Sequence, residues 1–125
     1  MPYPNARATM TVSATAEATV IKVEGEVDAL LTPRLRDQLA IEISLTPRAL
    51  VVDFRDVRFC SSSGLAALIR ACGDARAEGV PFALATRQHA VLRPMDLMNL
   101  RELLTVRPTV ADALEWAARP LTSPS

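Results

Sequence analysis

The stretch FCSSSGLAAL, residues 59–68, places three serines and a glycine between an apolar segment and a helix-like segment. Residues 49–54, ALVVDF, form a short apolar run of the kind found in a central strand that is buried on both faces. After the serines, apolar residues recur at the spacing of one helix face: Leu65, Leu68, Ile69 and Cys72. The stretch therefore predicts a buried strand, a loop over 55–60 that leads to the serines, and a helix that ends near Gly79.

The segments before this stretch predict an opening hairpin and one amphipathic helix. Residues 8–14 and 18–24 alternate apolar and polar side chains, which favours two strands joined by a short turn. Gly25 is expected to end the second strand, and Thr32 to cap a helix that has proline in its first position. Apolar residues of that helix share one face: Leu35, Leu39 and Ile43.

The segments after the stretch predict two strands and two helices. Residues 81–85 read as a buried strand, and a weaker helix over 89–98 is kinked or shortened by Pro94. A short last strand is expected over 103–106, followed by a helix that Thr109 caps. Strands that alternate with helices after a hairpin predict an α/β fold with a mostly parallel central sheet and about four helices.

The size of the chain suits one domain. Its 125 residues, 50% of them hydrophobic, are enough for a single core. We expect this domain to span residues 8–119, with flexible termini at 1–7 and 120–125. In such sheets ligands and chemistry gather at the carboxyl ends of the central strands, where the serines fall.

Composition argues against several classes of function. The net charge is +0 and the basic residues are spread along the chain, so the sequence shows no footprint for a nucleic acid. No apolar run is long enough to cross a bilayer, and the first residues do not resemble a signal peptide, so we expect a cytoplasmic protein without membrane contact. One histidine and two separated cysteines do not form a metal-binding set, and we expect no cofactor.

Three hypotheses account for the serines. A serine can cap the helix, which explains one hydroxyl but not three. A serine can be a nucleophile on a strand-to-helix turn, but the first glycine of Gly-x-Ser-x-Gly is missing and His89 is the single histidine. A serine can accept a phosphate, because a helix N-terminus stabilises an anion and residues 62–66 include no acid. Gly64 is then expected to keep side-chain bulk away from a modifying enzyme.

Three features together resemble the STAS domain family, specifically its stand-alone anti-sigma factor antagonists. They are GEVD (25–28) leading into a TPRLRDQL helix, VVDFRDVRFCSSSGLAAL (51–68), and a small α/β remainder that ends in a helix. The resemblance implies that Ser62 is the phosphoacceptor, with Ser61 and Ser63 as less favoured alternatives. It implies a regulatory binding protein of bacterial transcription and not an enzyme.

The resemblance also implies the partners. The unmodified protein binds an anti-sigma factor that is itself an ATP-dependent serine kinase, phosphorylation blocks this binding, and a phosphatase reverses it. The family's aspartate before the phosphoacceptor is Ser61 here. This departure leaves open a STAS adaptor or scaffold that binds a signalling complex or a transporter ATPase without being phosphorylated.

The surface expected to meet the partner surrounds the serines. Its candidate residues are Asp28, Arg58, Ser61, Ser63, Gly64 and Arg70. Asp74 and Arg76 are further candidates for its rim. A role as solvated helix charges explains Arg70, Asp74 and Arg76 equally well. Trp116 lies off the apolar face of the last helix and is expected to be partly exposed.

Overall fold

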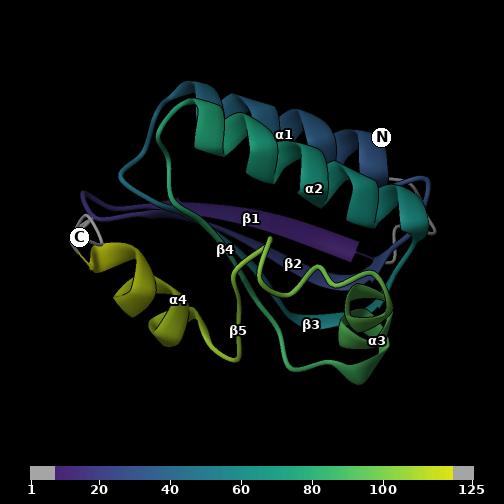
Figure 1. Ribbon diagram of the computed structural model, residues 1–125. Helices are drawn as coiled ribbons and strands as arrows, with labels where there is room; N and C mark the ends of the chain where they lie inside the picture. The colour runs from purple at the N-terminus through teal and green to yellow at the C-terminus, as the bar shows by residue number, and fades with distance from the viewer. Residues whose placement is uncertain (1–7, 120–125) are drawn as a thin grey trace.

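The computed structural model describes residues 8–119, which form a five-stranded sheet flanked by helices (Figure 1). In order across the sheet the strands are β1 (Ala8–Ala14), β2 (Thr19–Val27), β3 (Leu50–Cys60), β4 (Phe82–Ala85) and β5 (Val106–Arg107). The helices are α1 (Thr32–Ser44), α2 (Ser62–Ala77), α3 (His89–Leu97) and α4 (Val110–Ala118). β1 is antiparallel to β2, and every later neighbouring pair is parallel. For the described residues, the predicted mostly parallel α/β sheet with an opening hairpin is confirmed. The termini expected to be flexible, 1–7 and 120–125, lie outside the described residues.

The sheet carries an apolar cluster on each of its faces. Helices α1 and α2 run side by side over one face, and α4 covers the other (Figure 1). Successive residues of β3 serve both faces, because strand side chains alternate. Leu50 and Val52 join the larger cluster with Leu35 and Leu68, whereas Val51 joins the smaller cluster with Ala113. The predicted central strand is therefore buried on both sides.

Two strands are longer than predicted. β2 continues through Gly25, which has a φ of 106°, to Val27. The segment 55–60 was expected to be a loop but belongs to β3, and β2 pairs with it as far as Val27 and Cys60. The pairing register between β2 and β3 shifts on both sides of Gly25, and the two strands remain paired beyond these irregularities. Glycine tolerates the positive φ that such an irregularity needs.

The start of α1 and the position of the last strand also differ from the prediction. Leu31, and not Thr32, is the N-cap residue of α1, and its side chain makes no capping bond. Two backbone N–H groups, of Leu30 and Leu31, donate instead to Asp28 Oδ1, each at 3.0 Å. The last strand begins at Val106, because residues 101–105 form turns.

β3 carries one buried charge that the apolar pattern did not predict. Asp53 is 3% exposed at its side chain, and Arg55 donates to both of its carboxylate oxygens, at 2.9 and 3.0 Å. Burial pushes the pKa of Asp53 upward, but the hydrogen bonds and the charge of Arg55 outweigh it and hold the pKa below its ordinary value. The pair satisfies this carboxylate within the sheet.

Candidate functional site

The serines lie at the edge of the sheet where β2 and β3 end and where α1 and α2 both begin (Figure 1). The backbone N–H of Ser61 donates to the carbonyl of Val27 at 2.8 Å, which joins the two strand ends. The first turns of the two helices are thereby brought together. Residues 28–32 and 61–64, far apart in the sequence, form one site, as expected for the carboxyl ends of parallel strands.

Ser61 is the N-cap of α2. Its backbone is extended (φ −70°, ψ 166°), and its Oγ accepts a hydrogen bond from the N–H of Gly64 at 3.2 Å. Its carbonyl accepts the N–H of Leu65 at 3.0 Å. This is the usual geometry of a serine cap. Capping therefore accounts for Ser61, one of the three hydroxyls in question.

Ser63 belongs to a chain of hydroxyl groups that joins the two helix starts. Its Oγ lies 2.9 Å from Ser61 Oγ and 3.1 Å from Thr32 Oγ1. Thr32 Oγ1 in turn donates to the carbonyl of Asp28 at 2.9 Å. Thr32 was predicted only as a helix cap, so its contact with Ser63 is a site feature that the sequence did not reveal.

Ser62 is placed differently from both neighbours. It is the first residue of α2 and is exposed, as Ser63 is, but its Oγ alone among the three forms no hydrogen bond with any residue in the described range 8–119. The first turn of α2 contains no acidic residue. A helix of 16 residues presents free N–H groups and a partial positive charge at this end. The hydroxyl of Ser62 thus faces solvent at a place that favours an anion.

Gly64 faces the interior and not an approaching partner. It is buried, and a Cβ added to it would lie 2.8 Å from both Cys60 Sγ and Val27 Cγ1. The expected role of Gly64 in keeping the outer surface clear is therefore wrong. Its lack of a side chain lets α2 begin directly against the ends of β2 and β3.

Burial also raises the pKa of the neighbouring Cys60 thiol to about 12, so this thiol stays protonated at neutral pH.

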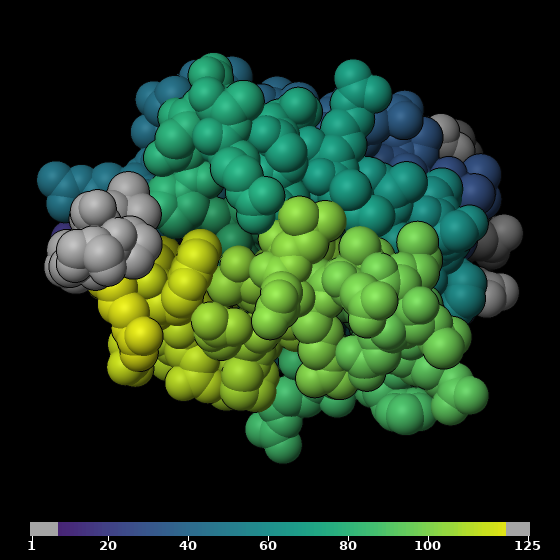
Figure 2. All heavy atoms as spheres, viewed as in Figure 1, coloured from purple at the N-terminus to yellow at the C-terminus, as the bar shows by residue number. Residues whose placement is uncertain are grey.

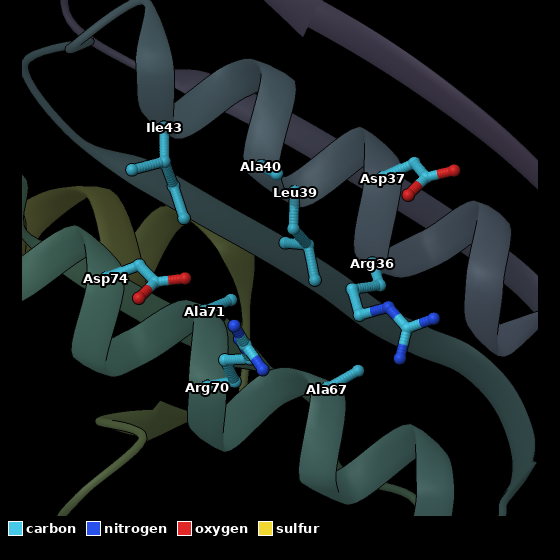
Figure 3. A pocket seen from close by; sticks show the side chains of 9 residues that line it. All are labelled: Arg36, Asp37, Leu39, Ala40, Ile43, Ala67, Arg70, Ala71 and Asp74. Atoms are coloured by element: carbon cyan, nitrogen blue, oxygen red, sulfur yellow. The ribbon is translucent and has the colours of Figure 1, made fainter.

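The predicted arginines lie apart from the hydroxyl chain. Arg58 is exposed near the end of β3, and Arg70 stands further along α2. Arg70 borders a groove of about 340 Å³ between α1 and α2, with Arg36 reaching in from the opposite helix (Figure 3). Asp74 lines the same groove, whereas Arg76 donates to the carbonyl of Leu103 at 3.4 Å. Arg76 therefore joins α2 to the segment before β5. Figure 2 shows the surface of α2, in teal and green, packed against that of the lime-green segment which precedes β5.

Two large apolar side chains stand out at the same edge of the sheet, and the sequence did not single them out. Leu30, in the turn that Asp28 holds, is 88% exposed. Phe59, which pairs with Glu26 at the end of β3, is 46% exposed. Exposed leucine and phenylalanine side chains of this kind can contribute to the apolar centre of a surface that binds another protein. For Leu30 the sequence did hold a signal, because a large apolar residue stands there in a predicted turn.

The remaining candidates have structural surroundings. Trp116 is half-buried against the smaller apolar cluster, with the Arg107 guanidinium 6.0 Å from its ring centre. His89 is exposed at the start of α3 and makes no hydrogen bond with a serine in the described part of the chain. Within residues 8–119 no three His, Cys, Asp or Glu side chains are grouped to hold a metal ion. The helices of this range are all too short or too polar to span a bilayer.

Comparison with known proteins gives a consistent result. The STAS domain profile matches residues 7–113. Anti-sigma-F factor antagonist RsfB of Mycobacterium tuberculosis is 29% identical over 106 residues, which are 85% of this chain and 86% of RsfB. The crystal structure of an anti-sigma factor antagonist from Mycobacterium paratuberculosis is 28% identical with a TM-score of 0.81, covering 95% of this chain and 100% of that one. The phosphorylated form of the Bacillus cell fate determinant SpoIIAA, 17% identical with a TM-score of 0.69, shares the fold over 86% of this chain and 98% of its own.

Proposed function

Since the chain belongs to the STAS domain family, we propose that it is an anti-sigma factor antagonist whose binding is switched at Ser62. The unmodified protein binds an anti-sigma factor with serine kinase activity in the cytoplasm. Transfer of phosphate from ATP, which the partner binds, then releases the complex, and a phosphatase restores the binding form. Transcription changes indirectly, through the sigma factor that the partner holds or frees. The names of RsfB and of the Mycobacterium paratuberculosis protein support this function.

One observation carries the choice of Ser62. Ser62 and Ser63 are both exposed, but Ser61 caps α2 and Ser63 contacts two other hydroxyls, whereas the hydroxyl of Ser62 bonds to no described residue. A kinase can therefore reach Ser62 without breaking an existing hydrogen bond. SpoIIAA, which shares this fold, has been solved in a phosphorylated form, so the fold is compatible with phosphorylation.

The electrostatics support a switch that leaves the fold in place. A phosphoserine carries about −1.5 to −2 charges at neutral pH, and a helix N-terminus stabilises such a charge. The first turn of α2 adds no acid to repel it. The partner, in contrast, meets a new charge on a surface that includes the exposed Leu30 and Phe59. Repulsion and the cost of desolvating the phosphate then weaken binding without a change in the backbone.

We propose that the partner covers the edge of the sheet around Ser62. The exposed apolar side chains of Leu30 and Phe59 supply the centre of this surface, because interface cores are apolar and their rims polar. Asp28 shapes the turn that presents Leu30, and the exposed Arg58 directly precedes Phe59 in β3. Arg70, further along α2, lies at the rim.

The proposal is tested by mass spectrometry and by binding. Protein isolated from its native cells under several growth conditions should carry phosphate on Ser62 in a fraction that depends on the conditions. Binding of the cognate anti-sigma factor should persist in Ser62→Ala and drop by at least about tenfold in Ser62→Asp, since a charge buried at an interface costs more than about 1.4 kcal/mol. Ser62→Asn is the neutral control of similar size and should bind like Ser62→Ala.

A second function is favoured by Ser61. The family's aspartate at this position is replaced by a neutral cap, which bonds to Gly64 and Ser63 instead of presenting a charge. An adaptor that binds its partner through the same edge without phosphorylation is compatible with this arrangement. For such an adaptor, the peptide with residues 59–70 carries no phosphate under any condition, and Ser62→Asp binds as well as Ser62→Asn.

A further inference from the structure

We infer that Thr32 selects Ser62 as the phosphoacceptor by holding the hydroxyl protons of Ser61 and Ser63 in a one-way hydrogen-bond chain. This inference rests on the proposed function, because it concerns which serine that modification reaches. Thr32 is 5% exposed, so a kinase does not contact it in this fold. It is therefore a positioning residue that acts through Ser63.

The two ends of the chain determine the direction of every proton in it. The carbonyl of Asp28 can only accept, so Thr32 uses its single hydroxyl proton there, at 2.9 Å. Thr32 Oγ1 must then accept from Ser63, 3.1 Å away. Ser63, having donated, must accept from Ser61, 2.9 Å away. Ser61 completes the chain by accepting from the N–H of Gly64, which can only donate. Each of the three hydroxyls therefore donates once.

This arrangement separates the three serines chemically. In phosphoryl transfer the serine Oγ forms a bond to the γ-phosphorus of ATP, the bond from that phosphorus to the bridging oxygen of ADP breaks, and the hydroxyl proton passes to a base of the kinase. For Ser61 or Ser63 the proton is already donated inside the chain, so the reaction must first break a hydrogen bond. For Ser62 no such bond exists within the described residues. The chain thus disfavours the two neighbours.

Removal of the Thr32 hydroxyl should leave one serine hydroxyl proton without an acceptor in the hydrogen-bond chain. Thr32→Val keeps the size and branching of the side chain but deletes the group that accepts from Ser63. The proton of Ser63 then becomes free, or the bond between the two serines reverses and the proton of Ser61 becomes free. Thr32→Ser retains the hydroxyl and is the matched control.

The test is the position of phosphate in protein produced in its native cells, read from fragmentation of the peptide with residues 59–70. In the wild type and in Thr32→Ser we expect phosphate on Ser62. In Thr32→Val the share on Ser61 and Ser63 together should rise about fivefold, the factor that the loss of a typical hydrogen bond represents. A distribution in Thr32→Val that equals that of the wild type would overturn the inference and leave the proposed function intact.

A second readout does not depend on the kinase. In the nuclear magnetic resonance spectrum of the folded protein at low temperature, hydroxyl protons held in hydrogen bonds exchange with water more slowly than free ones. We expect those of Thr32, Ser61 and Ser63 to be observed and that of Ser62 to be lost to exchange. In Thr32→Val one of the two serine signals should also disappear. Absence of phosphate from every variant rejects the proposed function. Rapidly exchanging hydroxyl protons of Ser61 and Ser63 in the wild type reject the hydrogen-bond chain.

Discussion

At the scale of single residues, two glycines of α2 have opposite surroundings. Gly64 is buried, and a Cβ there would lie 2.8 Å from Cys60 Sγ and from Val27 Cγ1. Gly73 is exposed, and a Cβ there would have no other atom within 4 Å. Neither has a positive φ among the described residues. The difference between them is therefore one of space and not of backbone conformation.

We predict that Gly64→Ala lowers the free energy of unfolding by roughly 1–3 kcal/mol, because overpacking forces the ends of β2 and β3 away from α2. Gly73→Ala should raise it by roughly 0.5–1 kcal/mol, because alanine loses less backbone entropy in a helix. Urea unfolding followed by circular dichroism measures both. Val27→Ala removes one of the two clashing atoms and should restore part of the loss in the Gly64→Ala background. Equal effects of the two glycine substitutions would contradict the packing at Gly64.

At the scale of the elements, the start of α2 is prepared for negative charge. The helix has a serine cap, no acid in its first turn and Arg76 in its last turn. Such a helix has a partial positive charge at its N-terminus that no acid of its own first turn opposes. The same feature that supports modification at Ser62 therefore predicts how charges introduced there affect stability.

Ser62→Asp should raise the free energy of unfolding by about 0.3–1 kcal/mol at low ionic strength, and Ser62→Lys should lower it by a similar amount. Added salt should shrink the difference between these two variants, since exposed charges are screened. Urea unfolding at two salt concentrations measures this, with Ser62→Asn as the neutral reference. If Ser62→Asp unfolds more easily than Ser62→Lys, then the N-terminus of α2 does not stabilise an anion, and the switch loses its electrostatic basis.

At the scale of the whole molecule, the two apolar clusters share their strands. β3 contributes Leu50 and Val52 to the larger cluster and Val51 to the smaller, and β4 alternates in the same way with Leu84 and Ala83. Loss of either layer of helices therefore exposes strands on which the other layer rests. This arrangement favours unfolding as one unit.

We predict that the fluorescence of Trp116, the single tryptophan of the chain, and far-ultraviolet circular dichroism show the same unfolding midpoint in urea. Trp116 reports on the smaller cluster, whereas circular dichroism is dominated by the elements around the larger one. Ala113→Gly weakens α4 by roughly 1 kcal/mol and should shift both signals together. A tryptophan transition that precedes the other signal would show that α4 detaches on its own.

The sequence determined the elements whose signals are local. Apolar spacing predicted the faces of α1 and α2, β-branched residues predicted the buried part of β3, and Thr109 was correctly identified as the cap of α4. It also placed the serines at the start of a helix behind a central strand. Each of these signals depends on residues within a few positions of one another, because helical and extended backbones have fixed periods.

Only the tertiary structure decided the features that join distant segments. The extension of β2 past Gly25 and of β3 through residues 55–60 depends on pairing between the two strands. The close packing around Gly64 depends on the atoms of Val27 and Cys60. The distinction among the three serines depends on Thr32, which lies 31 positions before Ser63. No local pattern records such a contact, since a hydroxyl finds its partner only when the strands have paired and the two helix starts have met.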